Sequence, residues 1–247
     1  MTRATISSLK VTSWNMNGNL RDKVPIIKQF AKDHDIVCIQ EHLLSKDSLD
    51  CIKFSDKHRF FIREAKSSCR GRPSGGIAIV IKDHISAKLV EQQDSFIAVD
   101  VYGLVLICVY LPTNYKNDRS ERKFNLSCEK LSKCVLRIKQ SGHEYLIIGD
   151  FNCDLTDTDS PRTQIALGVL PDGFKVVDKD KNFSYCHNSG SVSNLDHVVT
   201  SFNVQNESVS VLMGGTLSDH LPISLSFACP FSEVKKSAAP KLKVVQD

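Results

Sequence analysis

The stretch "LIIGDFNCD", residues 146–154, runs an apolar segment directly into a group of polar side chains. Residues 146–149 have the apolar character of a buried strand. Asp150 and Asn152 follow at once, on either side of one aromatic residue. A soluble loop accounts for this pattern, and so does a site for chemistry on a phosphate group. The rest of the chain has to distinguish these two interpretations.

The length and composition of the chain limit its class. Its 247 residues fit one large α/β domain or two small ones, and a hydrophobic content of 41% is enough for a substantial core. No apolar run approaches the ~20 residues of a membrane span. The first residues also lack the apolar segment of a signal peptide. We therefore expect an intracellular protein that is neither secreted nor membrane-bound.

The cysteines predict neither a zinc site nor a disulfide framework. There are nine of them, spread singly along the chain, and no two have the CxxC spacing of common zinc sites. An odd number of unpaired thiols is typical of a reducing compartment. Cys38 and Cys108 lie inside apolar segments, so we expect them to be small core residues.

The apolar pattern predicts many strands and few helices. Helices are expected at residues 23–32 and 120–140, the second with Ser120 as N-cap, and a short one after Pro161. A hairpin is expected over residues 96–110, with its turn at Tyr102 and Gly103. The remaining strands are expected at residues 9–14, 35–40, 75–81, 144–149, 174–177, 183–185, 195–200, 209–213 and 223–228.

These elements favour an α/β fold in which two mixed sheets pack together. Runs such as "LVLICVY" are apolar on both faces, so both faces of their sheet are expected to be covered. Two packed sheets with helices outside satisfy this within one domain, which we place at residues 1–230. The charged segment 231–247 is expected to be a flexible tail or linker.

Polar side chains recur at the ends of the expected strands. Each has an ordinary explanation on its own: Asn15 can cap a turn, Glu41 can lie on the surface, and His220 can be structural. Strands of one pair of sheets, however, can bring such groups to a single edge, where ligands tend to bind. The eight residues concerned are Asn15, Glu41, Tyr110, Asp150, Asn152, Asp196, Asp219 and His220.

These residue types suit the hydrolysis of a phosphodiester. The transition state spreads negative charge over the phosphate oxygens, and a hard cation such as Mg²⁺, which offsets that charge, prefers carboxylate ligands. Glu41 is the best candidate ligand, with Asn15 beside it. Asp150 can accept a proton from the attacking water. The donors Asn152, Tyr110 and His220 can hold developing charge, and Asp196 can keep His220 protonated.

The net charge is only +4, but many of the basic residues are concentrated in two clusters. They are "KHRFFIREAKSSCRGR", residues 57–72, and "KNDRSERK", residues 116–123. Each can be a solvated face or a contact surface for nucleic acid phosphates.

Seven motifs, in the order in which they occur along the chain, resemble those of the endonuclease/exonuclease/phosphatase superfamily. They are "SWNMNG", "IQEH", "SGGIAIVI", "VYLPTN", "IIGDFN", "NLDHV" and "LSDHLP". The resemblance implies a four-layer α/β sandwich. It implies metal-binding roles for Asn15 and Glu41. It also implies catalytic roles for the set Tyr110, Asp150, Asn152, Asp196, Asp219 and His220. The family's asparagine after the proline of the tyrosine motif is replaced here by Thr113, with Asn114 next.

Within the superfamily, "CIQEHLL" and "GGIAIVIKDH" look most like the apurinic/apyrimidinic-type endonuclease domain of non-LTR, LINE-type retrotransposons. That resemblance implies Mg²⁺- or Mn²⁺-dependent nicking of double-stranded DNA in the nucleus, leaving 5′-phosphate and 3′-hydroxyl. The hydroxyl would prime target-primed reverse transcription by a reverse transcriptase domain of the full-length protein. The residues expected to contact DNA are Arg70, Arg72, Asn114, Lys116, Arg119, Arg122, Ser184, Tyr185, His187 and Asn188.

Three alternatives remain open on the sequence alone. An apurinic/apyrimidinic DNA-repair endonuclease is expected to have an aromatic pocket for a flipped sugar, and the segment before Asp196 offers Phe183 and Tyr185 but no tryptophan. A lipid or inositol phosphatase of the same superfamily is disfavoured by the basic clusters. A non-catalytic DNA-binding module would require the acidic residues to be incidental.

Overall fold

The computed structural model describes residues 8–45, 57–67, 72–113, 117–204, 208–213 and 217–228. These residues form two six-stranded sheets and a two-stranded hairpin. The expected tail and the boundary of the expected domain lie outside the described residues. No helix in the described part of the chain is long and apolar enough to cross a membrane.

Each large sheet mixes parallel and antiparallel pairs. The first has the order β13 (Ser210–Val211), β14 (Ile223–Ala228), β1 (Ser8–Asn15), β2 (Ile36–Gln40), β4 (Ile77–Lys82) and β3 (His58–Arg63). The second has the order β5 (Ala87–Gln93), β6 (Phe96–Val101), β7 (Leu104–Tyr110), β8 (Glu144–Asp150), β12 (Asp196–Thr200) and β9 (Lys175–Val176). The parallel pairs are β1 with β2 and β7 with β8.

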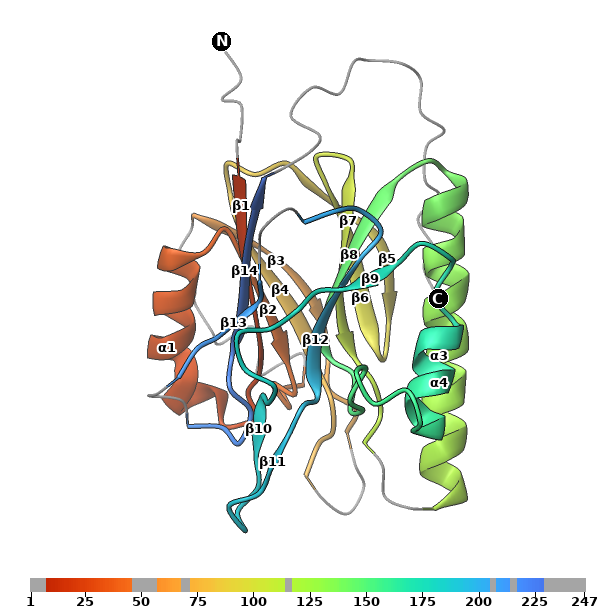
Figure 1. The fold of residues 1–247 in the computed structure, drawn as a ribbon. Coiled ribbons are helices and arrows are strands. Elements are labelled where there is room, and N and C mark those ends of the chain that lie inside the picture. The colour runs from red at the N-terminus through yellow and green to blue at the C-terminus, as the bar shows by residue number, and fades with distance from the viewer. Residues whose placement is uncertain are drawn as a thin grey trace.

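The helices lie outside the two sheets and complete four layers (Figure 1). Helix α1 (Leu20–Asp33) covers the first sheet, while α3 (Asp118–Gln140) and α4 (Pro161–Gly168) cover the second. The hairpin of β10 (Tyr185–Cys186) and β11 (Val192–Ser193) extends from the lower end in this view. The predicted α/β sandwich of two packed mixed sheets flanked by helices is therefore confirmed.

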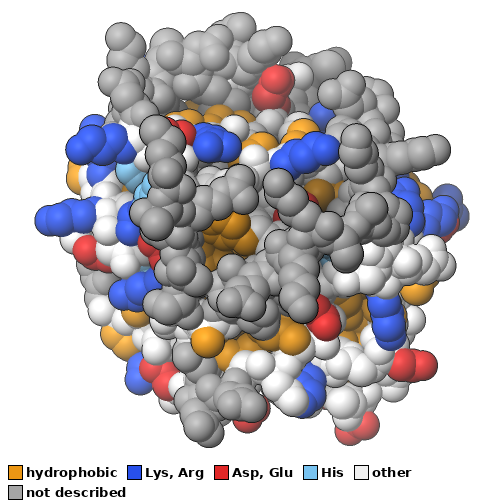
Figure 2. Space-filling view, turned by 90° about the horizontal axis from the view of Figure 1, so that it is seen from above, with side chains coloured by type: hydrophobic (Ala, Val, Ile, Leu, Met, Phe, Trp, Pro, Cys, Tyr) orange, Lys and Arg blue, Asp and Glu red, His pale blue; other side chains and the backbone are white. Residues whose placement is uncertain are grey.

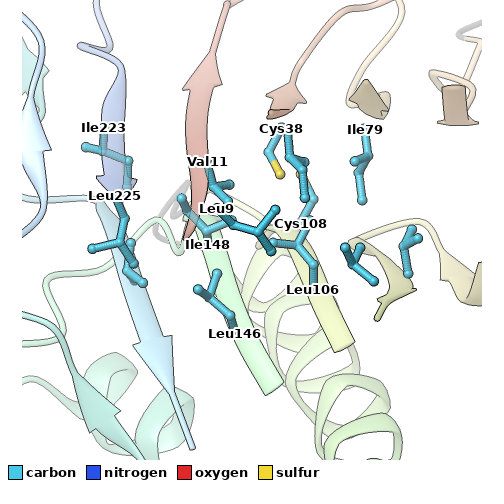
Figure 3. Close-up of a cluster of buried hydrophobic side chains, with 14 of the residues drawn as sticks. Leu9, Val11, Cys38, Ile79, Leu106, Cys108, Leu146, Ile148, Ile223 and Leu225 are labelled. Carbon is cyan, nitrogen blue, oxygen red and sulfur yellow. The ribbon is translucent and has the colours of Figure 1, made fainter. Parts of the chain in front are cut away.

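A continuous apolar core fills the space between the sheets. Figure 3 shows side chains of β14, β1, β2 and β4 facing those of β7 and β8. Cys38 and Cys108 are fully buried in this core, as predicted. A second apolar cluster lies between the second sheet and its helices, around Phe124 of α3. A third lies between the first sheet and α1, around Trp14 and Ile27. Burial on both faces explains why the central strands are apolar throughout.

The sequence patterns located most elements but misjudged some ends. The turn at Tyr102 and Gly103 is confirmed, and both residues have the positive φ that a tight hairpin needs. The N-cap of α3 is Asn117 instead of Ser120, because the Asn117 side chain accepts the Ser120 N–H at 2.9 Å. Three strands were missed, among them β11 (Val192–Ser193), which is only two residues long. β3 is only half-buried along its length, and β5 is polar with a register shift after Leu89.

Truncating a side chain in the central core should lower the free energy of unfolding more than truncating one on the surface. Ile79 of β4 has no exposed surface, so Ile79→Ala is expected to lower the free energy of unfolding by about 2–5 kcal/mol. Leu126→Ala removes a side chain that is 54% exposed and should cost well under half as much. Urea unfolding measures both values, and equal losses would contradict the packing described here.

Candidate active site

The ends of five strands, two from the first sheet and three from the second, lie at one edge. Asn15 ends β1 opposite Gln40 of β2, and Tyr110 ends β7 opposite Asp150 of β8. Asp196 begins β12 opposite the same Asp150. Because β1 and β2 are parallel, as are β7 and β8, their carboxyl ends lie together. This edge is at the lower end in Figure 1, where the β10–β11 hairpin also lies.

The carboxamide of Asn15 joins the two sheets at this edge. Its Nδ2 donates to Glu41 Oε1 at 3.1 Å and to Asp150 Oδ2 at 2.9 Å. Its Oδ1 accepts the backbone N–H of Asn17 at 2.9 Å, which fixes the orientation of the amide. Asn15 is fully buried, so one amide group brings together carboxylates that come from different sheets.

Glu41 is placed by an unusual backbone conformation. The chain leaves β2 with positive φ at Glu41 and at Leu43 (52° and 56°), and the buried His42 between them hydrogen-bonds to the Arg63 carbonyl at 3.0 Å. The hydroxyl of Tyr110 hydrogen-bonds with the Glu41 carboxylate. Burial and the neighbouring carboxylates of Glu41 and Asp150 hold the pKa of Tyr110 well above its usual value, so its hydroxyl keeps its proton.

Asp150 has no exposed surface, and its carboxylate is held by Asn152 as well as by Asn15. The backbone N–H of Asn152 donates to Asp150 Oδ1 at 2.7 Å. The Asn152 side chain donates to Asp150 Oδ2 at 3.1 Å and to the Leu111 carbonyl at 2.8 Å. Both amide hydrogens are thus used inside the protein, so Asn152 orients Asp150 here instead of presenting a donor. Burial raises the pKa of Asp150 above its usual range.

His220 lies between two carboxylates. Its Nδ1 is 2.9 Å from Asp196 Oδ2, and its Nε2 is 3.8 Å from Asp150 Oδ2. Trp14 Nε1 donates to the His220 carbonyl at 3.1 Å and fixes the backbone. Burial alone would lower the pKa of His220, but Asp196 and Asp150 outweigh burial and raise it above its usual value. The imidazole is therefore charged at neutral pH.

Asp219 lies at the rim and does not bond to this central group in the described residues. Both its carboxylate oxygens accept from Asn17 Nδ2 at 3.2 Å, and it hydrogen-bonds with Tyr185. Arg72 donates to the Asn17 carbonyl at 2.6 Å. Sequence reasoning missed Asn17, although it is the second asparagine of "SWNMNG" and the motif offered that signal.

The serines at the site support the backbone. Ser218 Oγ donates to the Asn15 carbonyl at 2.8 Å and accepts the His220 N–H at 3.2 Å. The prediction that Ser184 contacts DNA was wrong, because its side chain is fully buried. Ser184 Oγ instead accepts the N–H groups of Leu195 and Asp196 at 3.2 and 2.9 Å.

Of the other residues predicted to contact DNA, Tyr185 lies at the site. Tyr185 packs edge-on against His220, with ring centroids 4.7 Å apart, and against His187, with centroids 4.5 Å apart. Asn188, Arg119 and Arg122 are exposed. Arg70, Asn114 and Lys116 lie outside the described residues.

The first basic cluster is more neutralised than its sequence suggests. Arg59 pairs with Asp83 at 3.1 Å, while Arg63 and Lys66 both pair with Asp94, at 2.7 and 2.5 Å. These partners come from other segments of the chain, so the sequence window could not reveal them. The cations of this cluster are therefore partly balanced before any ligand binds.

A groove of about 460 Å³ begins at Tyr110 and runs along the first half of α3. Its cationic side chains are Lys66 on one wall and Arg119, Lys123 and Lys130 on α3. Asp94 and Glu64 also line it, so cations outnumber anions. Figure 2 shows the upper end of the molecule, away from the site, where lysine and arginine side chains are spread around the rim.

The acidic centre offers ligand atoms of the kind that hard divalent cations prefer. Asp150, Asp196 and His220 have potential ligand atoms within 4.8 Å of one another. Glu41, in contact with Asn15, adds a carboxylate that is only partly buried and so can be approached from outside. Oxygen donors from carboxylate and carboxamide groups suit Mg²⁺ or Mn²⁺. The residues present fit such an ion.

The two buried histidines of this region should differ in charge. His197 accepts the Leu155 N–H at 3.2 Å, and burial lowers its pKa to about 4. In metal-free protein at pH 7.5, we expect both ring nitrogens of His220 to be protonated and one nitrogen of His197 to be bare. Long-range ¹H–¹⁵N correlation spectra measure this, with assignments from His220→Gln and His197→Gln. A neutral His220 would contradict the described contacts.

Comparisons with known proteins agree with this architecture. A 3′ phosphatase, NExo from Neisseria bound to a product DNA hairpin, is 19% identical, with 90% of this chain and 100% of that chain covered and a TM-score of 0.64. An AP endonuclease from Archaeoglobus fulgidus is 17% identical, with 89% and 99% covered and a TM-score of 0.69. The APE2 catalytic domain of Xenopus laevis is 19% identical, with 90% and 94% covered and a TM-score of 0.66.

These likenesses show the shared fold. A search among curated proteins gives no match to this chain. The family model described as "Endonuclease/Exonuclease/phosphatase family" matches residues 12–220, which span every strand end that contributes to the site. The chain belongs to the endonuclease/exonuclease/phosphatase family.

Proposed function

We propose that this protein is a metal-dependent DNA endonuclease that nicks one strand by phosphodiester hydrolysis, leaving 5′-phosphate and 3′-hydroxyl. The observation that carries the proposal is the convergence of Glu41, Asp150 and His220 at one sheet edge, linked through Asn15 and Asp196. A carboxylate that can hold a metal ion, a base and a cation within one cluster suit the hydrolysis of a charged ester.

Glu41 and Asn15 would hold Mg²⁺ or Mn²⁺. When bound, such an ion offsets negative charge on the phosphate oxygens. Tyr110 keeps its proton and donates a hydrogen bond to Glu41, so a hydrogen bond from its hydroxyl to a phosphate oxygen would have to replace the bond to Glu41. Asn152 contributes by holding the Asp150 carboxylate in one orientation.

Asp150 is the proposed general base. Its pKa is raised by burial, and a base whose pKa lies nearer neutrality accepts a proton from water more effectively. His220 is the proposed cation that stabilises charge on the phosphate. The hydrogen bond that His220 Nδ1 donates to Asp196 keeps the imidazole in place and favours its charged form.

A nucleic acid substrate is supported by the surface next to the site. The groove at Tyr110 carries Lys66, Arg119, Lys123 and Lys130, spaced along a path that a phosphate backbone could follow. The Neisseria 3′ phosphatase of the same fold is bound to a product DNA hairpin. An extended cationic groove suits a long polyanion better than it suits the substrate of a lipid or inositol phosphatase.

The finer assignment rests on sequence motifs. "CIQEHLL" and "GGIAIVIKDH" resemble the endonuclease domains of LINE-type retrotransposons. We propose that the 3′-hydroxyl primes target-primed reverse transcription in the nucleus, by a reverse transcriptase domain of the full-length protein. A repair endonuclease is the second candidate, favoured by the likeness to an AP endonuclease. Oligonucleotides with and without one abasic site separate the two, since a large preference for abasic DNA favours repair.

Catalysis should depend on the ion and on the central residues. Supercoiled plasmid is expected to be nicked in Mg²⁺ and not in EDTA. Asp150→Ala and His220→Ala should each lower the nicking rate by at least about 10²-fold while DNA binding persists. His84→Ala, which changes an exposed histidine in the turn after β4, is the control and should nick normally. Nicking that persists in EDTA, or in Asp150→Ala, would contradict the mechanism.

DNA affinity should depend on salt through the groove. Replacing Arg119 and Lys123 together by alanine is expected to reduce the slope of log K against log salt by up to about 1.8, since each phosphate contact contributes about 0.9. Lys88→Ala, an exposed lysine on β5, should leave the slope unchanged. Fluorescence anisotropy with a labelled duplex measures the slopes, and an unchanged slope in the double variant rules out this groove as the DNA path.

A further inference from the structure

The backbone of Asp196 faces an incomplete edge of its sheet. On one side β12 pairs with β8 along its whole length, from Asp196 to Thr200. On the other side β9 pairs only with Val199 and Thr200, and the Val177 N–H reaches the Val198 carbonyl at 2.9 Å. No strand continues this edge as far as Asp196 in the described residues. Its outward N–H and C=O groups therefore need partners other than a strand.

Two side chains supply those partners. Ser184 Oγ accepts the Asp196 N–H at 2.9 Å. Lys179 Nζ donates to the Asp196 carbonyl at 2.6 Å and also to Asn194 Oδ1. The ammonium group thus occupies the position that a strand N–H would take at this edge. A hydrogen bond from a charged donor is stronger than the neutral bond it replaces.

Lys179 is itself held in place by backbone pairing. It forms a bridge with Val209, with the Val209 N–H donating to the Asp178 carbonyl at 2.8 Å and the Asp180 N–H to the Val209 carbonyl at 2.9 Å. Beyond Lys179, Asn194 Nδ2 donates to Asp154 Oδ1 at 2.9 Å. The stem of Lys179 is partly buried, so its head group has little freedom to leave Asp196.

We propose that Lys179 is a positioning residue for the hydrolytic reaction, which acts by fixing Asp196 and, through Asp196, the imidazole of His220. This rests on the proposed function. The chain of contacts is short: Lys179 to the Asp196 carbonyl, and Asp196 Oδ2 to His220 Nδ1 at 2.9 Å. Lys179 touches no reacting group. Loss of its ammonium frees the first residue of β12, on which the orientation of His220 depends.

Lys179→Met keeps the apolar stem and removes the donor. We expect kcat for plasmid nicking to fall by about 10- to 100-fold, the size of losing one charge-assisted hydrogen bond, with KM for DNA within about twofold. Lys175→Met is the matched control, because Lys175 lies on β9 at the same edge and contacts Asn203 instead. It should leave both constants unchanged. Wild-type kcat in Lys179→Met would overturn the proposal.

A double-mutant cycle separates positioning from general support of the fold. In the Asp196→Asn background, where His220 has already lost its charged partner, Lys179→Met should have little further effect on kcat. Equal losses in both backgrounds would show that Lys179 acts independently of Asp196 and would overturn the proposal. If Lys179→Met does not fold, Lys179→Gln, which shortens the donor's reach, enters the same cycle.

A spectroscopic readout makes the test independent of activity. In metal-free folded variants, the ring ¹H–¹⁵N signals of His220 should shift in Lys179→Met and stay in place in Lys175→Met, while those of exposed His84 stay in place in both. Unchanged His220 signals in Lys179→Met overturn the proposal. A wild-type protein that does not nick DNA in Mg²⁺ contradicts the proposed function, and the His220 signals then still decide whether Lys179 positions the imidazole.

Discussion

One amide group, that of Asn15, hydrogen-bonds to carboxylates from two different sheets, and the rest of the site is arranged around this bridge. Glu41 follows a strand of the first sheet and Asp150 ends a strand of the second. Bringing two carboxylates into a poorly solvated place is unfavourable unless donors compensate. The parallel pairs β1–β2 and β7–β8 make the arrangement possible, because both place their carboxyl ends at the same edge.

The balance of charge at this edge explains why its members depend on one another. Asp150 and Asp196 are both buried, and His220 is the cation between them. Removing His220 leaves two buried carboxylates without their cation, which is more costly than losing an exposed ion pair. The surrounding hydrogen bonds that involve Asn152, Trp14 and Ser218 reduce the freedom of each group.

The sequence predicted the layers and the polar positions beside the central strands well, because a buried strand and the polar residue next to it are local signals. Residues 146–150 carried both in one stretch, and Asp196 and His220 followed similar patterns. It could not predict contacts made across the fold. Nothing near Ser184 indicates that its hydroxyl faces Asp196, and nothing near Arg63 indicates its pairing with Asp94. Nor could it predict that the Asn152 side-chain amide donates a hydrogen bond to the carbonyl of Leu111, which is 41 residues away.

Because β9 is short, it leaves the edge of β12 at Asp196 open to the β10–β11 hairpin. Because no strand from the described part of the chain lies beside Asp196 on that side, the base of the β10–β11 hairpin can approach it and bond to both halves of the site. Ser184 contacts Asp196 through its hydroxyl, and its carbonyl accepts the Leu221 N–H at 2.7 Å. The Cys186 N–H donates to the Asp219 carbonyl at 2.8 Å. The hairpin base is thus held to Asp196 by a side-chain hydroxyl and to the segment before β14 by backbone groups, whereas its tip, at His187 and Asn188, is exposed. An exposed tip residue such as Asn188 can therefore change without displacing the Asp196–His220 pair, whereas His187 packs against Tyr185, which itself packs against His220.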